Sequence, residues 1–318
     1  MRISAALTVS LLLTGASALA AEKSDAPVKP EIGLSANPNR FGEKAPDDAF
    51  GAFQRGLYKT ALNLALLKAA QGDPNAQALA AEIYARGLGV AVNHKEAARL
   101  YALAADKGVL EAQLQAALYH LEGRYLPKDK AKAEALMQKA AERGNPLAEF
   151  NYAQMLMQAS PGEPGIQKAV PFFLKSASKG QAEAQYAMSQ IMMTGAGGQQ
   201  PDEAAARAWL EKSAAQGFDT AQVDLAAWLI DGIGGRKDYD AAFKWLRRAA
   251  TSGNIAAAAR LAKLYRDGIG TEASSENAAA WYIKAKRAGL KDAGLDDFMD
   301  GLTDEEMQKA IALANTFK

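Results

Sequence analysis

Apolar and polar positions recur along this chain with a helical period, in segments that end at glycine. After each of the first six of seven regularly spaced glycines, positions 4, 8, 11 and 12 are largely small or apolar, whereas positions 7, 10 and 14 are largely polar. These repeat glycines stand 36 or 37 residues apart, and they are Gly72, Gly108, Gly144, Gly180, Gly217, Gly253 and Gly289. The pattern predicts an array of stacked helical repeats. A position counted from a repeat glycine is called a register below.

A second set of glycines divides each unit into two helices. Five of six units have a glycine at register 15, where a left-handed residue can close the first helix: Gly87, Gly123, Gly195, Gly232 and Gly268. Short polar residues fifteen positions before the closing repeat glycine are predicted N-caps of the second helix: Asn93, Asp129, Asp202, Asp238 and Ser274. Asp73-Pro74 and Asn145-Pro146 have the same role for first helices. The additional residue of the fourth unit is predicted in its inter-helix loop.

Alanines at register 4 predict close helix crossings: Ala76, Ala112, Ala148, Ala184, Ala221 and Ala257. Because two helices of this size cannot bury their apolar faces alone, neighbouring units must stack into a superhelix. Six full units are predicted over 73–289. A shortened pair over 47–72 is predicted to cap one end. In 290–318, Thr303 and Glu306 predict a capping box that opens a last amphipathic helix, with Met307, Ala310, Ile311 and Ala314 on one side.

The first 46 residues have a different character. Arg2, an apolar stretch from Ala5 to Ala16 and the small residues Ala18 and Ala20 predict a secretory signal peptide over 1–20, cut before Ala21. The alternative is a membrane anchor, but the apolar run is shorter than the roughly 20 residues that span a bilayer. Residues 21–46 are rich in Pro, Lys, Asn, Ser and Gly, and predict a disordered linker.

Composition excludes several classes of function. The formal net charge is +1, and falls to near zero without Arg2, so nucleic acid is not an expected partner. The chain has no cysteine, which excludes disulfides, thiolate metal sites and a lipoprotein anchor.

Catalytic chemistry is not indicated either. The two histidines, His94 and His120, form no zinc motif, and no phosphate loop or serine nucleophile elbow is present. His120 occupies a register held by tyrosine in other units and is predicted to be packed, whereas His94 is predicted to be solvated surface. We therefore expect no catalytic residue, no cofactor and no metal site. The methionines Met155, Met157, Met188, Met192 and Met193 predict either core filling or an adaptable binding patch.

The unit as a whole resembles a Sel1-like repeat, a variant of the tetratricopeptide theme. The resemblance is carried by these motifs of the first unit: Ala76-Gln77, Tyr84, Gly87-Leu88-Gly89-Val90, Ala97, Leu100-Tyr101 and Ala104-Ala105. Asp231-Gly232-Ile233-Gly234 with Trp245, and Gly268-Ile269-Gly270 with Trp281-Tyr282, repeat them. The third unit departs, because Ala159 and Pro161 replace the paired loop glycines. The resemblance implies an all-α protein, an α/α solenoid wound as a right-handed superhelix, that serves as an adaptor in protein complexes.

The polar registers of the first helices supply the candidate binding residues. The resemblance implies that first helices line the concave side of the solenoid, where partners commonly bind. The predicted protein-binding residues are Gln115, Asn151, Gln154, Gln158, Gln190, Thr194, Asp224 and Asp231. The alternative is an ordinary solvated face.

We therefore expect a monomeric periplasmic or secreted scaffold that binds an envelope or extracellular protein, without stable membrane insertion after signal cleavage. Restraint of a membrane sensor, or organisation of cell-wall machinery, is a role that the resemblance implies. Two alternatives are a carbohydrate- or peptidoglycan-binding module and a β-lactamase-like hydrolase. The first needs exposed aromatic rings that the polar registers lack, and the second, by resemblance, needs cysteines.

Overall fold

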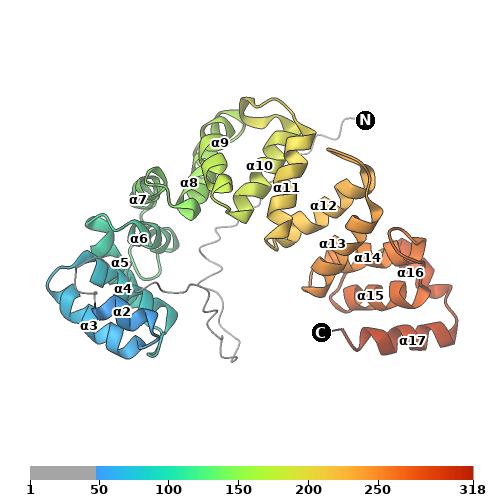
Figure 1. Ribbon diagram of the computed structural model, residues 1–318, viewed down its shortest axis with the longest axis horizontal. Coiled ribbons are helices and arrows are strands. Elements are labelled where there is room, and N and C mark those ends of the chain that lie inside the picture. The colour runs from blue at the N-terminus through green and yellow to red at the C-terminus, as the bar shows by residue number, and fades with distance from the viewer. Residues whose placement is uncertain (1–47, 318) are drawn as a thin grey trace, which may run out of the picture. The chain divides into compact units, whose positions relative to one another are not determined.

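The computed structural model describes residues 48–317, and within them it contains only helices and their connecting loops (Figure 1). The signal peptide and the linker predicted over 1–20 and 21–46 lie outside the described residues. The described chain forms two compact units, residues 48–155 and 156–317. The α/α solenoid expected from the sequence is confirmed in the packing of consecutive helices within each unit.

The N-terminal unit begins with a short helix pair and continues with alternating first and second helices of the repeats. Its helices are α2 (Asp48–Gln54), α3 (Tyr58–Ala70), α4 (Pro74–Arg86), α5 (His94–Asp106), α6 (Leu110–Glu122), α7 (Lys130–Glu142) and most of α8 (Pro146–Ala159). Each helix from α2 to α6 packs against the next one along the chain.

The C-terminal unit continues the alternation and ends in two further helices. Its elements after α8 are α9 (Glu163–Ser178), α10 (Ala182–Thr194), the 3-10 turn η2 (Ala196–Gly198), α11 (Glu203–Ala215), α12 (Asp219–Asp231), α13 (Tyr239–Thr251), α14 (Ile255–Asp267), α15 (Ser275–Arg287), α16 (Ala293–Asp300) and α17 (Asp304–Ala314). From α9 to α14 each helix again packs against its successor, and α17 packs on α15.

The predicted helix caps are confirmed residue by residue. The side chains of Asn93, Asp129, Asp202, Asp238 and Ser274 each accept a hydrogen bond from the backbone N–H three residues later. The five register-15 glycines close first helices in the left-handed conformation. The fourth repeat has eight residues, 195–202, between its helices, against seven, 232–238, in the fifth, so its additional residue does lie in this loop.

Buried glutamines connect three of the first helices, α4, α10 and α12, to the helix before each of them. At register 5, Gln77, Gln185 and Gln222 are 7%, 5% and 2% exposed. Their side-chain amides donate hydrogen bonds to the carbonyls of Ala69, Ala177 and Ala214, at 3.3, 3.1 and 3.1 Å. Each of these carbonyls belongs to the last turn of the preceding helix, and it also accepts a hydrogen bond from the backbone N–H of the repeat glycine, at 3.0 Å. The glutamines are therefore structural caps between helices.

The loop between the two helices of a repeat packs against the second helix of the preceding repeat. A Cβ atom at Gly234 would lie 2.3 Å from the carbonyl oxygen of Glu203, and one at Gly270 would lie 2.1 Å from that of Tyr239. Both oxygens belong to the first turn of the second helix of the preceding repeat. The loop backbone can approach that helix so closely because glycine has no side chain.

The third repeat differs from the others, as the substituted glycines suggested. Only residues 160–162 separate α8 from α9, and α9 has 16 residues where the other second helices have 13. The longer helix brings Gly165 against the preceding loop, where a Cβ would lie 1.9 Å from the carbonyl oxygen of Ser160. Pro171 lies inside α9.

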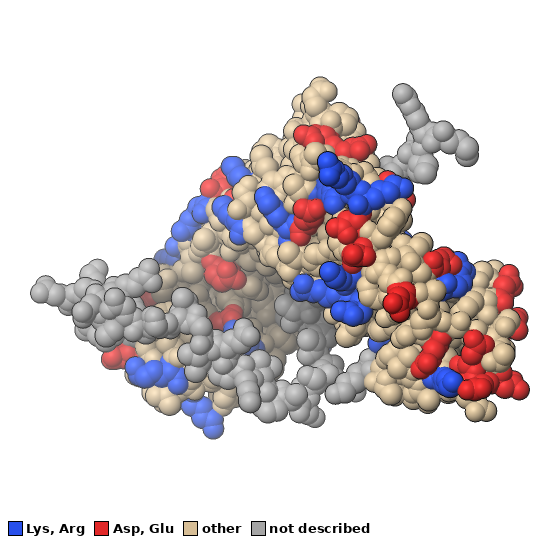
Figure 2. Space-filling view, turned by 45° about the vertical axis from the view of Figure 1, so that its right-hand side comes forward, with Lys and Arg blue, Asp and Glu red and all other residues tan. Residues whose placement is uncertain are grey.

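The C-terminal end contains one helix more than the sequence predicted. The capping box between Thr303 and Glu306 is confirmed, but α16 precedes it, with Asp292 as its N-cap. Ala310 and Ala314 of α17 are buried, whereas Ile311, predicted on the same side of the helix, is 41% exposed. Acidic side chains gather over these last helices, at the lower right of Figure 2.

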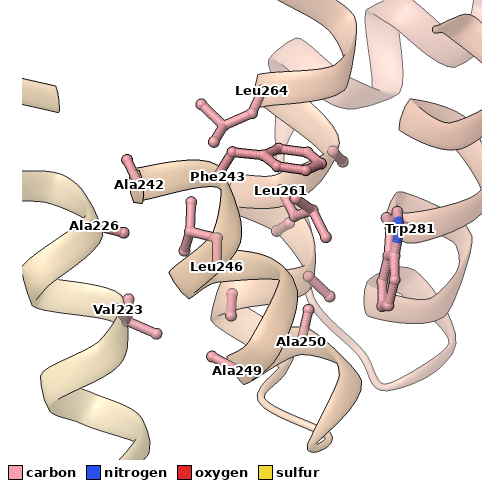
Figure 3. Packing of buried hydrophobic residues seen from close by; sticks show 14 of the residues in the cluster. Val223, Ala226, Ala242, Phe243, Leu246, Ala249, Ala250, Leu261, Leu264 and Trp281 are labelled. Carbon is pink, nitrogen blue, oxygen red and sulfur yellow. The ribbon is translucent and has the colours of Figure 1, made fainter. Parts of the chain in front are cut away.

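The core of the C-terminal unit is a strip of alanines and larger aliphatic residues between consecutive helices. Phe243 of α13 lies beside Leu261 and Leu264 of α14, as Figure 3 shows. The register-4 alanines are all buried, with 2% exposure or less, which confirms them as close-packing positions. Met155 and Met188 are also buried, which favours core filling for these two methionines.

Candidate functional site

The candidate site is the polar face of the first helices, defined by registers 7, 10 and 14 and called the first-helix face below. Six of the eight predicted binding residues reach the surface. Gln115, Gln190 and Asp224 are half-buried, and Gln158, Thr194 and Asp231 are exposed. Gln115 lies on α6 of the N-terminal unit, whereas the other five lie on α8, α10 and α12 in the C-terminal unit.

Asn151 and Gln154 do not belong to an open surface, so their prediction as binding residues is corrected. They are 1% and 3% exposed, and both amide atoms of Asn151 are buried without a hydrogen-bond partner among the described residues. Registers 7 and 10 adjoin the buried stripe of the helix. In other repeats they hold Ala187 and Leu118, which are 4% and 8% exposed. A polar residue at these registers can therefore lie inside.

Hydrogen bonds hold the first helices of the C-terminal unit side by side. The Tyr186 hydroxyl of α10 donates to the Asp224 carboxylate of α12 at 2.8 Å. Burial, followed by the negative charge of Asp224, raises the pKa of Tyr186 above its usual range, so the phenol stays a donor at neutral pH. One repeat further, the Arg260 guanidinium of α14 donates to the Val223 carbonyl of α12 at 3.4 Å.

Sequence reasoning missed two residues of this face, Arg260 and Lys263. They occupy registers 7 and 10 of α14, so the same register rule would have found them in the sixth repeat. Two shallow pockets, of about 240 and about 230 Å³, both border on this pair. Leu290 and Asp292 also line the first pocket. The second pocket is lined by Ala227, Ile230, Leu246 and Leu264 as well.

The two cations differ in their partners. Lys263 forms an ion pair with Asp292 at 2.5 Å. This contact lowers the pKa of the Asp292 carboxyl group. Arg260 is exposed and pairs with no carboxylate in the described part of the chain. The first-helix face thus changes from amide and hydroxyl groups on α10 to acidic groups on α12 and basic groups on α14.

The histidines contribute to packing. His120 is 5% exposed, and its Nδ1 lies 2.9 Å from the Pro127 carbonyl oxygen, in line with the predicted packed role. His94 is half-buried, its Nδ1 lies 3.2 Å from the Tyr119 hydroxyl, and its ring lies 5.4 Å from that of Tyr125. The solvated surface predicted for His94 is therefore wrong. Tyr125 of the second repeat stands at the position that Gly234 and Gly270 occupy in their repeats. Its ring contacts His94, which belongs to the preceding second helix α5.

Residues 48–317 contain no cluster of three or more His, Cys, Asp or Glu side chains arranged to hold a metal ion. None of the helices in this range has the length and apolar character needed to cross a membrane.

Solved structures show the same architecture in bacterial proteins. A Sel1 repeat protein from Oxalobacter formigenes is 26% identical, with a TM-score of 0.65, over 78% of this chain and 100% of that one. A protective antigen of uropathogenic Escherichia coli strains, described as displaying an SLR fold, is 27% identical with a TM-score of 0.56. That match covers 81% of this chain but spans only 63% of the length of the antigen. Among curated proteins, none matches this chain significantly.

The repeats themselves match a family profile throughout the predicted array. The Sel1 repeat profile matches six segments, 74–109, 110–145, 146–181, 182–218, 220–254 and 255–290. These segments make up more than half of the chain, and their limits coincide with the helix pairs of the structure. The chain therefore belongs to the Sel1 repeat family.

Proposed function

We propose that this protein is a non-catalytic adaptor that binds a partner protein along the first-helix face of its C-terminal unit. Sel1 repeat proteins generally mediate protein–protein interactions, and the family is typically one of scaffolds without enzymatic activity. The observation that carries the proposal is the exposed Arg260, which lines two pockets and donates a hydrogen bond to the backbone of the neighbouring first helix, α12. A pocket with apolar lining next to unpaired charge is typical of protein-binding surfaces.

We also propose that the protein works in the periplasm or outside the cell, on an envelope or extracellular partner. The support is the sequence of residues 1–20, with its basic start, short apolar stretch and small residues before Ala21. Regulation of a membrane sensor and organisation of cell-wall machinery both fit an adaptor in this compartment.

The proposal is tested by affinity capture from a periplasmic extract with the chain beginning at Ala21. Arg260→Glu and Asp231→Lys reverse the charge of the first-helix face, and we expect each to reduce retention of the specific partner by about tenfold or more. Binding that persists in both variants would contradict the first-helix face as the site.

The matched control is Lys139→Glu, an exposed charge reversal on the second helix α7. We expect this variant to retain the partner at the wild-type level, and all three variants to keep their helical content by circular dichroism. Loss of the partner from the Lys139 variant alone would move the site to the second helices.

A further inference from the structure

The second helices of the C-terminal unit carry a repeated pair of an aromatic residue and a cation. The aromatic residue stands eight positions before the repeat glycine, and the cation stands five positions before it. We call these four pairs the aromatic–cation row: Phe172 with Lys175, Trp209 with Lys212, Trp245 with Arg248 and Trp281 with Lys284. At the same positions the N-terminal unit has leucines or, once, a leucine with Lys139, so the row is confined to one unit.

Each pair is formed in space as well as in sequence. The Lys212 Nζ lies 4.2 Å from the centre of the Trp209 ring, and the Arg248 Cζ lies 5.6 Å from that of Trp245. These separations lie in the range of cation–π contact. The Lys284 ammonium group on α15 also donates to the Ala250 carbonyl on α13 at 3.4 Å, so the last two pairs lie on neighbouring second helices.

The last pair of the row already binds an aromatic side chain. Phe317, three residues beyond α17, stacks on Trp281 with ring centres 4.2 Å apart and an interplanar angle of 21°. Lys284 lies 5.4 Å from the Trp281 ring and 5.9 Å from the Phe317 ring, so one cation contacts both. With this cover Trp281 is only 7% exposed.

The two middle pairs have the same composition without such a cover. Trp209 and Trp245 are half-buried, and within residues 48–317 neither contacts another aromatic ring. Lys212 and Arg248 are exposed and pair with no carboxylate of the described chain. A partly exposed indole beside an unpaired cation presents an apolar surface and a positive charge together.

The geometry points to a second binding surface at Trp209–Lys212 and Trp245–Arg248, for a segment of a partner protein that carries aromatic side chains next to carboxylates. Phe317 on Trp281 shows the mode of binding, because its ring stacks on the indole while the Lys284 ammonium group contacts both rings. The carboxylates of the partner segment would neutralise the two unpaired cations. This surface is separate from the first-helix face, and either proposal can fail while the other stands.

The test uses N-acetyl-phenylalanine, the smallest probe with one aromatic ring and one carboxylate. The chain has four tryptophans, and their indole N–H signals in a proton–nitrogen NMR spectrum are assigned by single Trp→Phe variants. We expect saturable shifts of the Trp209 and Trp245 signals and little change at Trp281, which Phe317 covers. No saturable shift at Trp209 or Trp245 would overturn the proposal.

Two variants sharpen the test. Phe317→Ala uncovers Trp281, so its indole signal should begin to respond to the probe. Lys212→Glu should weaken the response at Trp209 by about two- to fivefold, while Trp245 in the same molecule serves as the control. An unchanged affinity at Trp209 in this variant would remove the cation from the proposed site.

Two further probes separate protein from carbohydrate as the occupant. N-acetyl-phenylalaninamide lacks the carboxylate and should bind more weakly than the acid. Glucuronate carries a carboxylate on a sugar ring and should leave Trp209 and Trp245 unshifted. Equal or tighter binding of glucuronate would identify an acidic glycan as the occupant and overturn the assignment to a protein segment.

Discussion

The glycines of this array have two different structural roles, which are distinguished by how much space surrounds the position of the missing Cβ atom. Gly253 ends a repeat with a φ of 99°, and a Cβ there would meet nothing within 4 Å. Gly270 lies in an inter-helix loop with a φ of 67°, and a Cβ there would lie 2.1 Å from the Tyr239 carbonyl oxygen. Only the second glycine is needed both for its backbone conformation and for its size.

Alanine substitution should therefore affect the two positions unequally. Gly253→Ala adds only the strain of a left-handed alanine, and should reduce the free energy of unfolding by about 1 kcal/mol. Gly270→Ala also forces the loop away from α13, and should reduce it by about 3 kcal/mol or more. Thermal melting by circular dichroism compares the two variants directly. Equal shifts in melting temperature would mean that the loop does not press on the preceding helix.

Residues whose role depends on near neighbours in sequence could be predicted, and residues whose role depends on packing could not. Asn93 and Ser274 cap helices because a side-chain oxygen reaches a backbone N–H three residues away, which the sequence alone specifies. Asn151 and Gln154 have the polar character of a surface residue, but their burial depends on what packs over registers 7 and 10. Arg260 was missed only because the register rule was not carried into the sixth repeat.

At the scale of the elements, two ion pairs connect the last repeat to the short helix that follows it: Lys263 with Asp292, and Lys286 with Asp296 at 2.7 Å. Asp292 caps the N-terminus of α16 through the Leu295 N–H at 3.2 Å and pairs with Lys263 of α14 at 2.5 Å. The sequence did not reveal α16, because eight residues are too few to show a helical period. Its signals were the cap at Asp292 and the buried Leu295.

The Asp292 contact makes the C-terminal end sensitive to acid. The hydrogen bond from Lys263 holds the pKa of Asp292 below its usual range, so the folded state favours the charged carboxylate. The resulting stability is present above the ordinary aspartate pKa of about 3.9 and is lost as the pH falls through the lower folded pKa. The thermal stability of wild type should therefore decline more steeply below about pH 4 than that of Asp292→Asn.

The matched control for this pH dependence is Asp297→Asn, on the same helix, at a carboxylate that makes no hydrogen bond or ion pair within residues 48–317. Melting temperatures from pH 2 to pH 7 give the comparison. The control variant should follow the wild-type pH profile. Parallel curves for wild type and Asp292→Asn would show that this ion pair does not contribute to acid sensitivity.

For the molecule as a whole, the N-terminus of the mature protein tests the proposed location. We expect the exported protein to begin at Ala21, because Ala18 and Ala20 supply the small residues that signal peptidase requires before its cleavage site. Intact mass spectrometry of the protein from a periplasmic fraction measures this. A product that keeps Met1 and stays with the membrane would contradict the proposed location.

The repeat architecture was predictable at this scale because the sequence has a period of about 36 residues that is still visible although many positions differ between repeats. The division at residues 155 and 156 was not predictable from that period, because the repeats continue across it. The third repeat did carry a signal of irregularity, in Pro161 and Pro171. The aromatic–cation row also follows the period, but its arrangement on Phe317 could be recognised only in three dimensions.

The close contacts of the loop glycines and the hydrogen bonds of the register-5 glutamines also affect how such a chain can change length over evolution. At the junction of the fourth and fifth repeats, for example, the fourth repeat supplies the carbonyl groups of Glu203 and Ala214, and the fifth supplies the loop glycine Gly234 and the amide of Gln222. Duplication of one 36-residue unit in the gene would therefore copy both halves of a junction together, and the new repeat would arrive with partners on each side. Insertion of a fraction of a unit would separate them, which favours growth of this family by whole repeats.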